Sequence, residues 1–154
     1  MILAVLLALQ NQSLWQVQRH VDAMTDKVSV QATSKSLDGS ATITYACPAR
    51  PERGPGIYIT TDEFIGGGPR AFRHGLYRVD QRPAVEEDWF HSDHTVMVTA
   101  HGKPTQLASD IVSGSRLRVR FEDFNGHSRD LDFDLSGART AVETVSKSCA
   151  NPAS

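Results

Sequence analysis

Two short alternating runs near the carboxyl end constrain the fold of this chain more than any other feature. In residues 116–121 arginine alternates with apolar side chains, and in residues 130–135 aspartate does the same. Alternation with a period of two is typical of a strand that has one buried and one solvated face. Turn residues lie between the runs, at Phe124, Asn125 and Gly126, so the segment predicts a β-hairpin.

The loop length sets the register of this hairpin. A two-residue loop, Asn125-Gly126, would mix charged and apolar side chains on each face, which a half-buried sheet tolerates poorly. A three-residue loop that begins at Phe124, with Gly126 in the left-handed conformation, keeps the faces separate. The expected charge pairs are then Arg120–Asp130, Arg118–Asp132 and Arg116–Asp134. We interpret this ladder as the solvated face of the sheet, with a binding surface as the alternative.

A helix is predicted after the hairpin, over residues 137–149. Its apolar positions recur with the spacing of one helical face, and Cys149 lies on that face. A second short helix is expected over residues 104–113, where Pro104 suits the first turn. Further strands are expected at 27–33, 40–47, 57–61, 71–79 and 94–100, with a polar connection at 83–88 before an element that begins at Trp89. The pattern predicts a mainly β fold, a small antiparallel β-sandwich-like domain whose C-terminal helix packs on the sheet.

The first nine residues are apolar. As a helix they would span only ~14 Å, against a hydrocarbon core of ~30 Å, so we do not expect a membrane span. We expect residues 1–13 to be a signal peptide and residues 14–154 to form one domain, periplasmic or secreted. A misassigned start codon and a buried first strand are the alternatives.

Cys47 and Cys149 are the two cysteines of the sequence. In an exported chain such a pair favours a disulfide, which would close a loop of about a hundred residues and stabilise the fold by ~4–5 kcal/mol on a chain-entropy model. Two buried free thiols in a cytosolic protein are the alternative. If the bond forms, the final helix lies over the strand that ends at Cys47.

The charge balance limits the partners that the chain can have. The formal net charge is −2, and lysine and arginine do not cluster. This argues against nucleic acid or an anionic membrane surface as the main partner. No cofactor motif is recognised.

The densest group of potential metal ligands is His91, Asp93 and His94. With His127 and Arg139 it imitates a 2-His-1-carboxylate iron site, and the two histidines by themselves would suit zinc. The plain interpretation is a polar loop that enters a strand. We therefore expect no metal site and keep these three residues as the weak candidate.

Other residues that draw attention have ordinary explanations. The glycines 66–68 lack the ending of a phosphate-binding loop and predict a turn. The acidic run Glu86, Glu87 and Asp88 predicts a solvated segment, and no nucleophile motif is recognised. The aromatic residues Tyr77, Trp89 and Phe90 suit the core or a sheet face better than a ligand platform, and Trp15 is placed to fasten the first segment to the core.

Several motifs occur in an order that resembles the VasI-like family of exported bacterial proteins, named for a type VI secretion-associated member. They are Trp15, the Met-Thr-Asp element at 24–26, Tyr-Arg-Val-Asp at 77–80, Trp89, Phe-Asp-Leu-Ser-Gly-Ala at 133–138 and the two cysteines. The likeness spans residues 15–149 and is carried by order and spacing. The chain departs from the family at Ala46, where a basic residue is common, and at the hairpin tip, which lacks the usual Pro-Tyr-Gly.

The resemblance implies a small β-rich extracytoplasmic domain with a disulfide between the matching cysteines, and it brings no catalytic residues with it. From it we expect a non-enzymatic binding or accessory factor of the bacterial envelope, with an envelope protein or cell-wall component as partner. Type VI secretion is a property of some members only. The alternative function is a small metal-dependent envelope enzyme that uses His91, Asp93 and His94.

Overall fold

The computed structural model describes residues 14–47, 56–68, 72–98 and 106–150. Within these residues the chain forms nine strands and two helices. The strands are β1 (Gln16–Val21), β2 (Val28–Lys35), β3 (Ala41–Ala46), β4 (Gly56–Thr61), β5 (Phe72–Val79), β6 (Val85–Ser92), β7 (Thr95–Met97), β8 (Arg116–Glu122) and β9 (Ser128–Asp134). The helices are α1 (Gln106–Ser113) and α2 (Ala138–Ala150).

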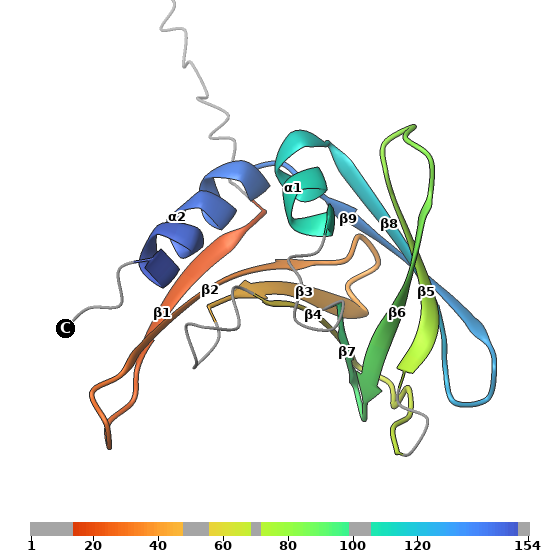
Figure 1. Cartoon of the computed structure of the whole chain (residues 1–154), viewed down its shortest axis with the longest axis horizontal. Helices are drawn as coiled ribbons and strands as arrows, with labels where there is room; N and C mark the ends of the chain where they lie inside the picture. The colour runs from red at the N-terminus through yellow and green to blue at the C-terminus, as the bar shows by residue number, and fades with distance from the viewer. Residues whose placement is uncertain (1–13, 48–55, 69–71, 99–105, 151–154) are drawn as a thin grey trace, which may run out of the picture.

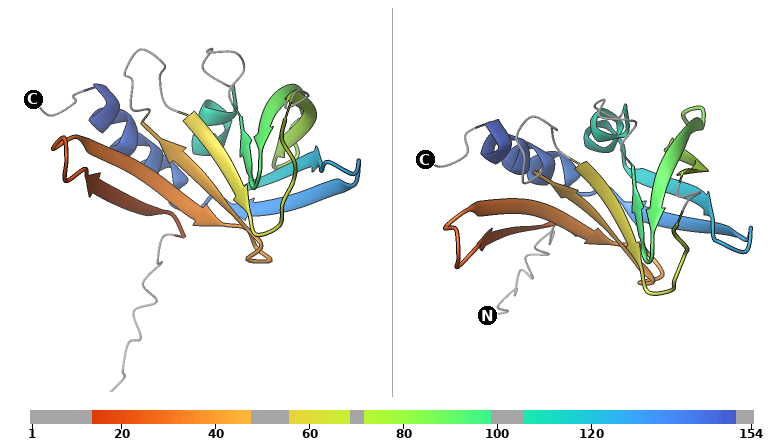
Figure 2. Two further views of the ribbon diagram at one scale, coloured as in Figure 1. Left: turned by 90° about the horizontal axis from the view of Figure 1, so that it is seen from below. Right: turned by 60° about the horizontal axis from the view of Figure 1, so that its bottom comes forward.

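All nine strands belong to one antiparallel sheet in the order β1-β2-β3-β4-β7-β6-β5-β8-β9. The sheet bends strongly, so that its two halves enclose a common core (Figures 1 and 2). A bridge between Ser36 and Phe133, with a hydrogen bond from the Leu37 N–H to the Asp132 carbonyl, joins the end of β2 to β9. The mainly β fold with two helices is therefore confirmed, and its sandwich-like character comes from one bent sheet.

The β8–β9 hairpin has the predicted register. Arg120 lies opposite Asp130 and Arg118 opposite Asp132, and Gly126 has a φ of 79°. Each of these arginines holds its aspartate with two hydrogen bonds, of 2.6 Å at Arg120 and of 2.7 and 2.8 Å at Arg118. The charges lie on the solvated face, while Leu117, Val119, Phe121, Leu131 and Phe133 are buried on the other.

The core includes a close contact between neighbouring strands β5 and β6. The Trp89 side chain of β6 is buried against β5 at Gly75, where a Cβ atom would lie 2.2 Å from the indole ring. Only glycine leaves room for the ring at that position. Trp89 thereby reaches the core, which confirms one of the two interpretations of this aromatic residue.

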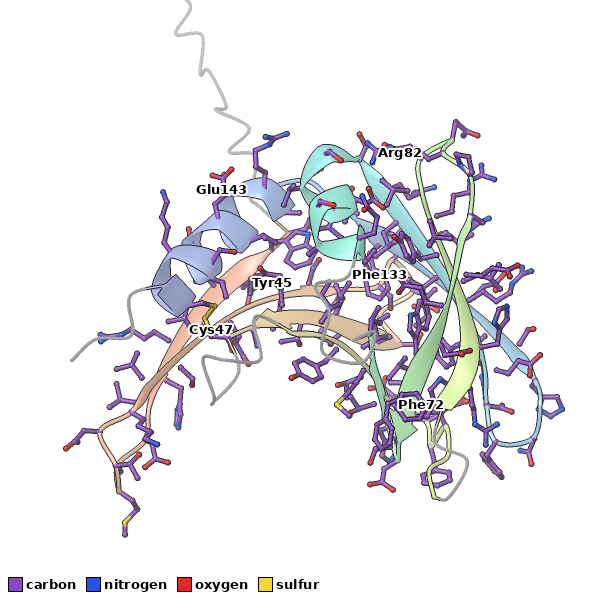
Figure 3. The ribbon with its side chains drawn as sticks, viewed as in Figure 1. Tyr45, Cys47, Phe72, Arg82, Phe133 and Glu143 are labelled. Atoms are coloured by element: carbon purple, nitrogen blue, oxygen red, sulfur yellow. A yellow bond between two sulfur atoms is a disulfide. The ribbon has the colours of Figure 1, made fainter. Side chains whose placement is uncertain are left out.

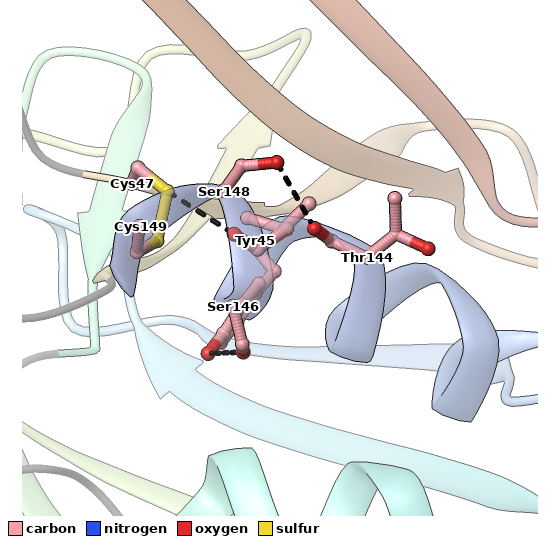
Figure 4. Close-up of a disulfide and its surroundings, with 7 residues drawn as sticks. Tyr45, Cys47, Thr144, Ser146, Ser148 and Cys149 are labelled. Atoms are coloured by element: carbon pink, nitrogen blue, oxygen red, sulfur yellow. Dashed lines mark hydrogen bonds between the residues drawn. A yellow bond between two sulfur atoms is a disulfide. The ribbon is translucent and has the colours of Figure 1, made fainter. Parts of the chain in front are cut away.

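Helix α2 packs on β1, β2 and β3. A disulfide joins Cys47, just after β3, to Cys149 near the end of α2, with the Cα atoms 5.4 Å apart. The Tyr45 and Ser146 hydroxyl groups are hydrogen-bonded at 2.9 Å beside it (Figure 4). The predicted disulfide and the position of the helix over the strand ending at Cys47 are both confirmed.

Helix α1 is fastened to β5 and to the β5–β6 turn. The buried Tyr77 hydroxyl donates to Asp110 at 3.1 Å, and burial, then this carboxylate, raise the pKa of Tyr77. Arg82 in the turn contacts Asp110 and donates to the Ser113 carbonyl at 2.9 Å. Figure 3 shows Arg82 at the helix-bearing end of the molecule and Phe72 at the opposite end.

Two predictions about the strands were incomplete. β1 was not predicted, because its six residues are all exposed and give no buried stripe. β6 begins at Val85 and not at Trp89, so the acidic run lies within a strand. Charged residues can occupy this part of the strand because the Glu86 and Asp88 side chains lie on the outer face of β6 and are exposed to solvent.

Several expectations concern residues outside the described ranges. These are the signal peptide, Pro104 and the first part of the helix predicted there, and the end of the strand predicted to reach residue 100. Within the described ranges, neither helix is long and apolar enough to cross a bilayer.

Candidate binding surface at the loop end of the sheet

Three connecting segments meet at the end of the sheet away from the helices: residues 62–68 after β4, the β6–β7 turn, and the β8–β9 tip. The Ile65 N–H donates to the Asp93 carbonyl at 2.7 Å, and Gly66 forms a bridge with Asp93. A Cβ atom on Gly66, whose φ is 111°, would lie 2.7 Å from the Phe124 Cβ atom. Three segments that the sequence analysis treated separately therefore form one surface.

Each segment contributes an exposed ring. The Phe64 ring lies 5.3 Å from Phe124 and 6.0 Å from His94, in both cases edge to face. Phe64 is 47% exposed and Phe124 is 51% exposed. We call these three residues the aromatic loop cluster. Exposed aromatic residues that gather on one surface are typical of interaction sites.

A buried carboxylate supports the cluster from below. Asp123 is 2% exposed, and its carboxylate accepts the backbone N–H groups of Asn125 and His127 at 2.9 and 3.0 Å. Burial by itself would raise the pKa of Asp123, but these N–H groups, together with the His127 and Arg129 side chains, outweigh it and the pKa is lowered. The carboxylate therefore stays charged and fixes the hairpin tip on which Phe124 stands.

Two arginines connect this tip to the neighbouring segments. Arg73 of β5 donates to the Asp123 carbonyl oxygen at 2.8 Å. Arg129 of β9 contacts the Asp123 carboxylate and forms an ion pair with Glu63, next to Phe64. The segments that carry the rings of the cluster are consequently held to one another by hydrogen bonds and ion pairs.

His91 lies beneath this surface, fully buried, with its ring 5.6 Å from that of Phe121. Neither ring nitrogen, nor the Nε of Arg73, has a hydrogen-bond partner among the described residues. Burial, and secondarily the charge of Arg73, lower the pKa of His91 to about 4. The histidine is therefore neutral at pH 7 and is held at an energetic cost.

The structure does not bring His91, Asp93 and His94 together as ligands. His91 points into the core, Asp93 occupies the turn with a φ of 53°, and His94 packs on Phe64. Within the described part of the chain, no three His, Cys, Asp or Glu side chains are placed to share a metal ion. His127 instead lies 3.6 Å from Asp123 at the hairpin tip, and Arg139 is exposed on α2.

The remaining residues that the sequence singled out lie outside the cluster or support it. Tyr77 is buried, as is Trp15, whose indole donates to the Asp134 carbonyl at 3.2 Å. Phe90 is half-buried on the outer face of β6, and Glu87 accepts a hydrogen bond from Trp89.

Sequence reasoning missed Phe64 and the role of Phe124. A signal was available, because each is a large apolar residue inside a turn segment, where polar residues and glycine are usual.

Comparison with known proteins gives a structural match. No family model matches the sequence, and no curated protein does, so the VasI-like resemblance rests on the motifs alone. The fold is similar to that of invasion associated protein B from Bartonella henselae, with a TM-score of 0.59 over 92% of this chain and 96% of that chain. Identity between the two is 10%, so the match establishes a shared fold.

Proposed function

We propose that this chain is an extracytoplasmic bacterial binding or accessory factor that works without catalysis and contacts an envelope protein or a cell-wall component through the aromatic loop cluster. The observation that carries the proposal is the exposure of Phe64, His94 and Phe124 together on a base built around Asp123. Folding alone gives no reason to expose two phenylalanines side by side.

Three observations support a location outside the cytoplasm. The Cys47–Cys149 disulfide is typical of an oxidising compartment. The run of nine apolar residues at the start of the sequence has the length of the apolar region of a signal peptide. The structural match is to a protein described as invasion-associated, and a role at the cell surface or envelope agrees with that description. Type VI secretion is a narrower hypothesis that only the VasI-like motifs support.

The rigidity of the surface favours binding. An aromatic side chain on an already ordered backbone leaves less conformational entropy to be lost when a partner covers it. The hydrogen bonds from Asn125 and His127 to Asp123 supply that order at the hairpin tip. The alternative function, a metal-dependent enzyme using His91, Asp93 and His94, has no comparable support, since those side chains point in different directions.

The proposal is tested by site-specific photo-crosslinking in cells that produce the protein. A crosslinking amino acid at position 64 or 124 should give a discrete adduct with an envelope component, whereas the same group at the exposed Val21 of β1 should not. The double variant Phe64→Ser/Phe124→Ser should lose the adduct formed from position 94. Equal labelling from all positions, or an adduct that survives the double variant, would contradict the proposal.

A further inference from the structure

A second apolar surface crosses the outer face of the sheet. Registers of neighbouring strands place Tyr58 of β4 beside Met97 of β7, Met97 beside Phe90 of β6, and Phe90 beside Phe72 of β5. We call these four residues the outer aromatic row. They alternate along their strands with the core residues Ile57, Ile59, Trp89, His91 and Val96, so their side chains point away from the core.

The row presents apolar side chains to solvent. Phe72 is 51% exposed and lies 5.4 Å from the half-buried Phe90, edge to face. The Tyr58 ring lies over Gly56, because a Cβ atom on that glycine would approach the ring and hydroxyl to between 2.7 and 3.0 Å. One face of the tyrosine ring is thereby covered by its own strand, and Tyr58 as a whole is half-buried. Phe, Tyr and Met are the residue types that interface cores favour.

The two flanks of the row differ in charge. On one side, the neighbours two positions along the strands and on the same face are Thr60, Thr95 and Ser92, which are uncharged. On the other side Glu86 and Asp88 have side chains that are 67% and 68% exposed, with His74 between them at 3.7 and 4.0 Å. Glu122 of β8 adds a further exposed carboxylate, whereas the nearby Arg120 is already held by Asp130. This flank is therefore acidic.

We propose that the outer aromatic row docks a basic amphipathic helix of a partner protein. Apolar residues of the helix cover Phe72, Phe90, Met97 and Tyr58, and lysine or arginine residues along one side pair with Glu86 and Asp88. The acidic flank selects a cationic partner, because opposite charges across an interface favour the correct partner over others.

The position of the row decides between a helix and an added strand. The row lies on the face of the sheet, where the backbone of β4, β7, β6 and β5 is already paired on both sides. A partner strand would gain no backbone hydrogen bonds there, whereas a helix satisfies its own backbone and presents side chains only. The outer aromatic row shares no residue with the aromatic loop cluster, so a helix can bind the row whether or not the cluster binds a partner.

The test uses two synthetic helical peptides that share one leucine stripe and differ only in the residues beside it, lysine in one and glutamate in the other. Binding to the full chain is followed by NMR of backbone amides and of the Met97 methyl group. We expect the lysine peptide to perturb resonances of β4, β5, β6 and β7, and to bind at least tenfold more tightly than the glutamate peptide.

Three variants test whether the lysine peptide binds at the outer aromatic row and whether Glu86 and Asp88 set its charge preference. Phe72→Thr/Phe90→Thr should weaken lysine-peptide binding at least tenfold, since threonine keeps strand preference and removes the apolar surface. Val17→Thr/Val21→Thr, which changes two exposed apolar residues of β1, is the control and should bind like the parent. Glu86→Lys/Asp88→Lys should reverse the preference in favour of the glutamate peptide.

The outcomes separate this inference from its competitors. Equal binding of both peptides, shifts confined to other strands, or an unchanged preference after charge reversal would overturn it. Binding of isolated peptidoglycan that is lost in Phe72→Thr/Phe90→Thr, without peptide binding, would show a glycan platform and also overturn it. Loss of crosslinks from positions 64 and 124 has no bearing on these measurements, so failure of the two proposals is distinguishable.

Discussion

The two ends of the molecule are built differently. At the helix end, the Cys47–Cys149 disulfide, the Tyr45–Ser146 hydrogen bond and the Tyr77–Asp110 hydrogen bond join helices to strands. At the loop end, phenylalanine rings are exposed and His91 is buried with both nitrogens unpartnered among the described residues. One end is arranged for stability, whereas the other keeps features that folding alone does not favour.

This difference indicates where binding is to be sought. Unsatisfied buried polar groups and exposed aromatic residues each reduce the stability margin of a domain, which is small in any case. A covalent link at the opposite end offsets that cost. The loop end can therefore present Phe64 and Phe124 without loss of the fold.

The largest expected effect comes from removing the disulfide. The variant Cys47→Ser/Cys149→Ser should lose about 4–5 kcal/mol of unfolding free energy, because a loop of about a hundred residues is no longer closed in the unfolded chain. Denaturant unfolding of the oxidised parent and the double variant measures the difference. If the double cysteine variant lost less unfolding free energy than Phe64→Ser/Phe124→Ser, the helix end would not be the more stabilising end of the molecule.

A smaller effect is expected from acid at the loop end. The pKa of His91 is about 4 in the folded protein against an ordinary value of 6.5, so the unfolded chain binds more protons between these values. The contribution of neutral His91 to the unfolding free energy should therefore be complete above pH 6.5. As the pH falls toward 4, the unfolding free energy should decrease by about 1–3 kcal/mol, with allowance for screening by solvent.

The variant His91→Phe isolates this contribution. Its unfolding free energy should vary less between pH 6.5 and 4 than that of the parent, because phenylalanine does not titrate. His94→Phe, which changes an exposed histidine at the same end, is the control and should keep the parental pH dependence. If the unfolding free energies of the parent and of His91→Phe changed equally with pH, His91 would not be the cause of the loss of stability in acid.

The smallest effect is expected from the charge ladder, which belongs to neither end. Exchange of the partners, Arg120→Asp/Asp130→Arg, should leave the denaturation midpoint nearly unchanged, since exposed ion pairs contribute little and both residues remain beside each other. The single variant Arg120→Asp places like charges opposite and should lower the midpoint more. If the exchange abolished the crosslinks from position 64 or 124, the ladder would be part of the binding surface after all.

The elements with a clear buried stripe were predictable. The β8–β9 register follows from the alternation of arginine and aspartate with apolar residues, and the inward position of Cys149 follows from helical spacing. β1 and the start of β6 were not predictable in this way, because β1 is exposed throughout and the first residues of β6 are acidic. Two of the three positions of the aromatic loop cluster were noticed in the sequence, His94 and the turn at Phe124, but only as separate features.

The sequence by itself determined which residues share a face within one strand or one helix, because that depends on a local periodicity of 2 or 3.6. The tertiary structure decided which faces meet. It placed Phe64, His94 and Phe124 on one surface, aligned Tyr58, Met97, Phe90 and Phe72 across four strands, and turned His91 into the core while His94 stayed outside. These relations depend on strand order and register between segments distant in the chain, which no local pattern specifies.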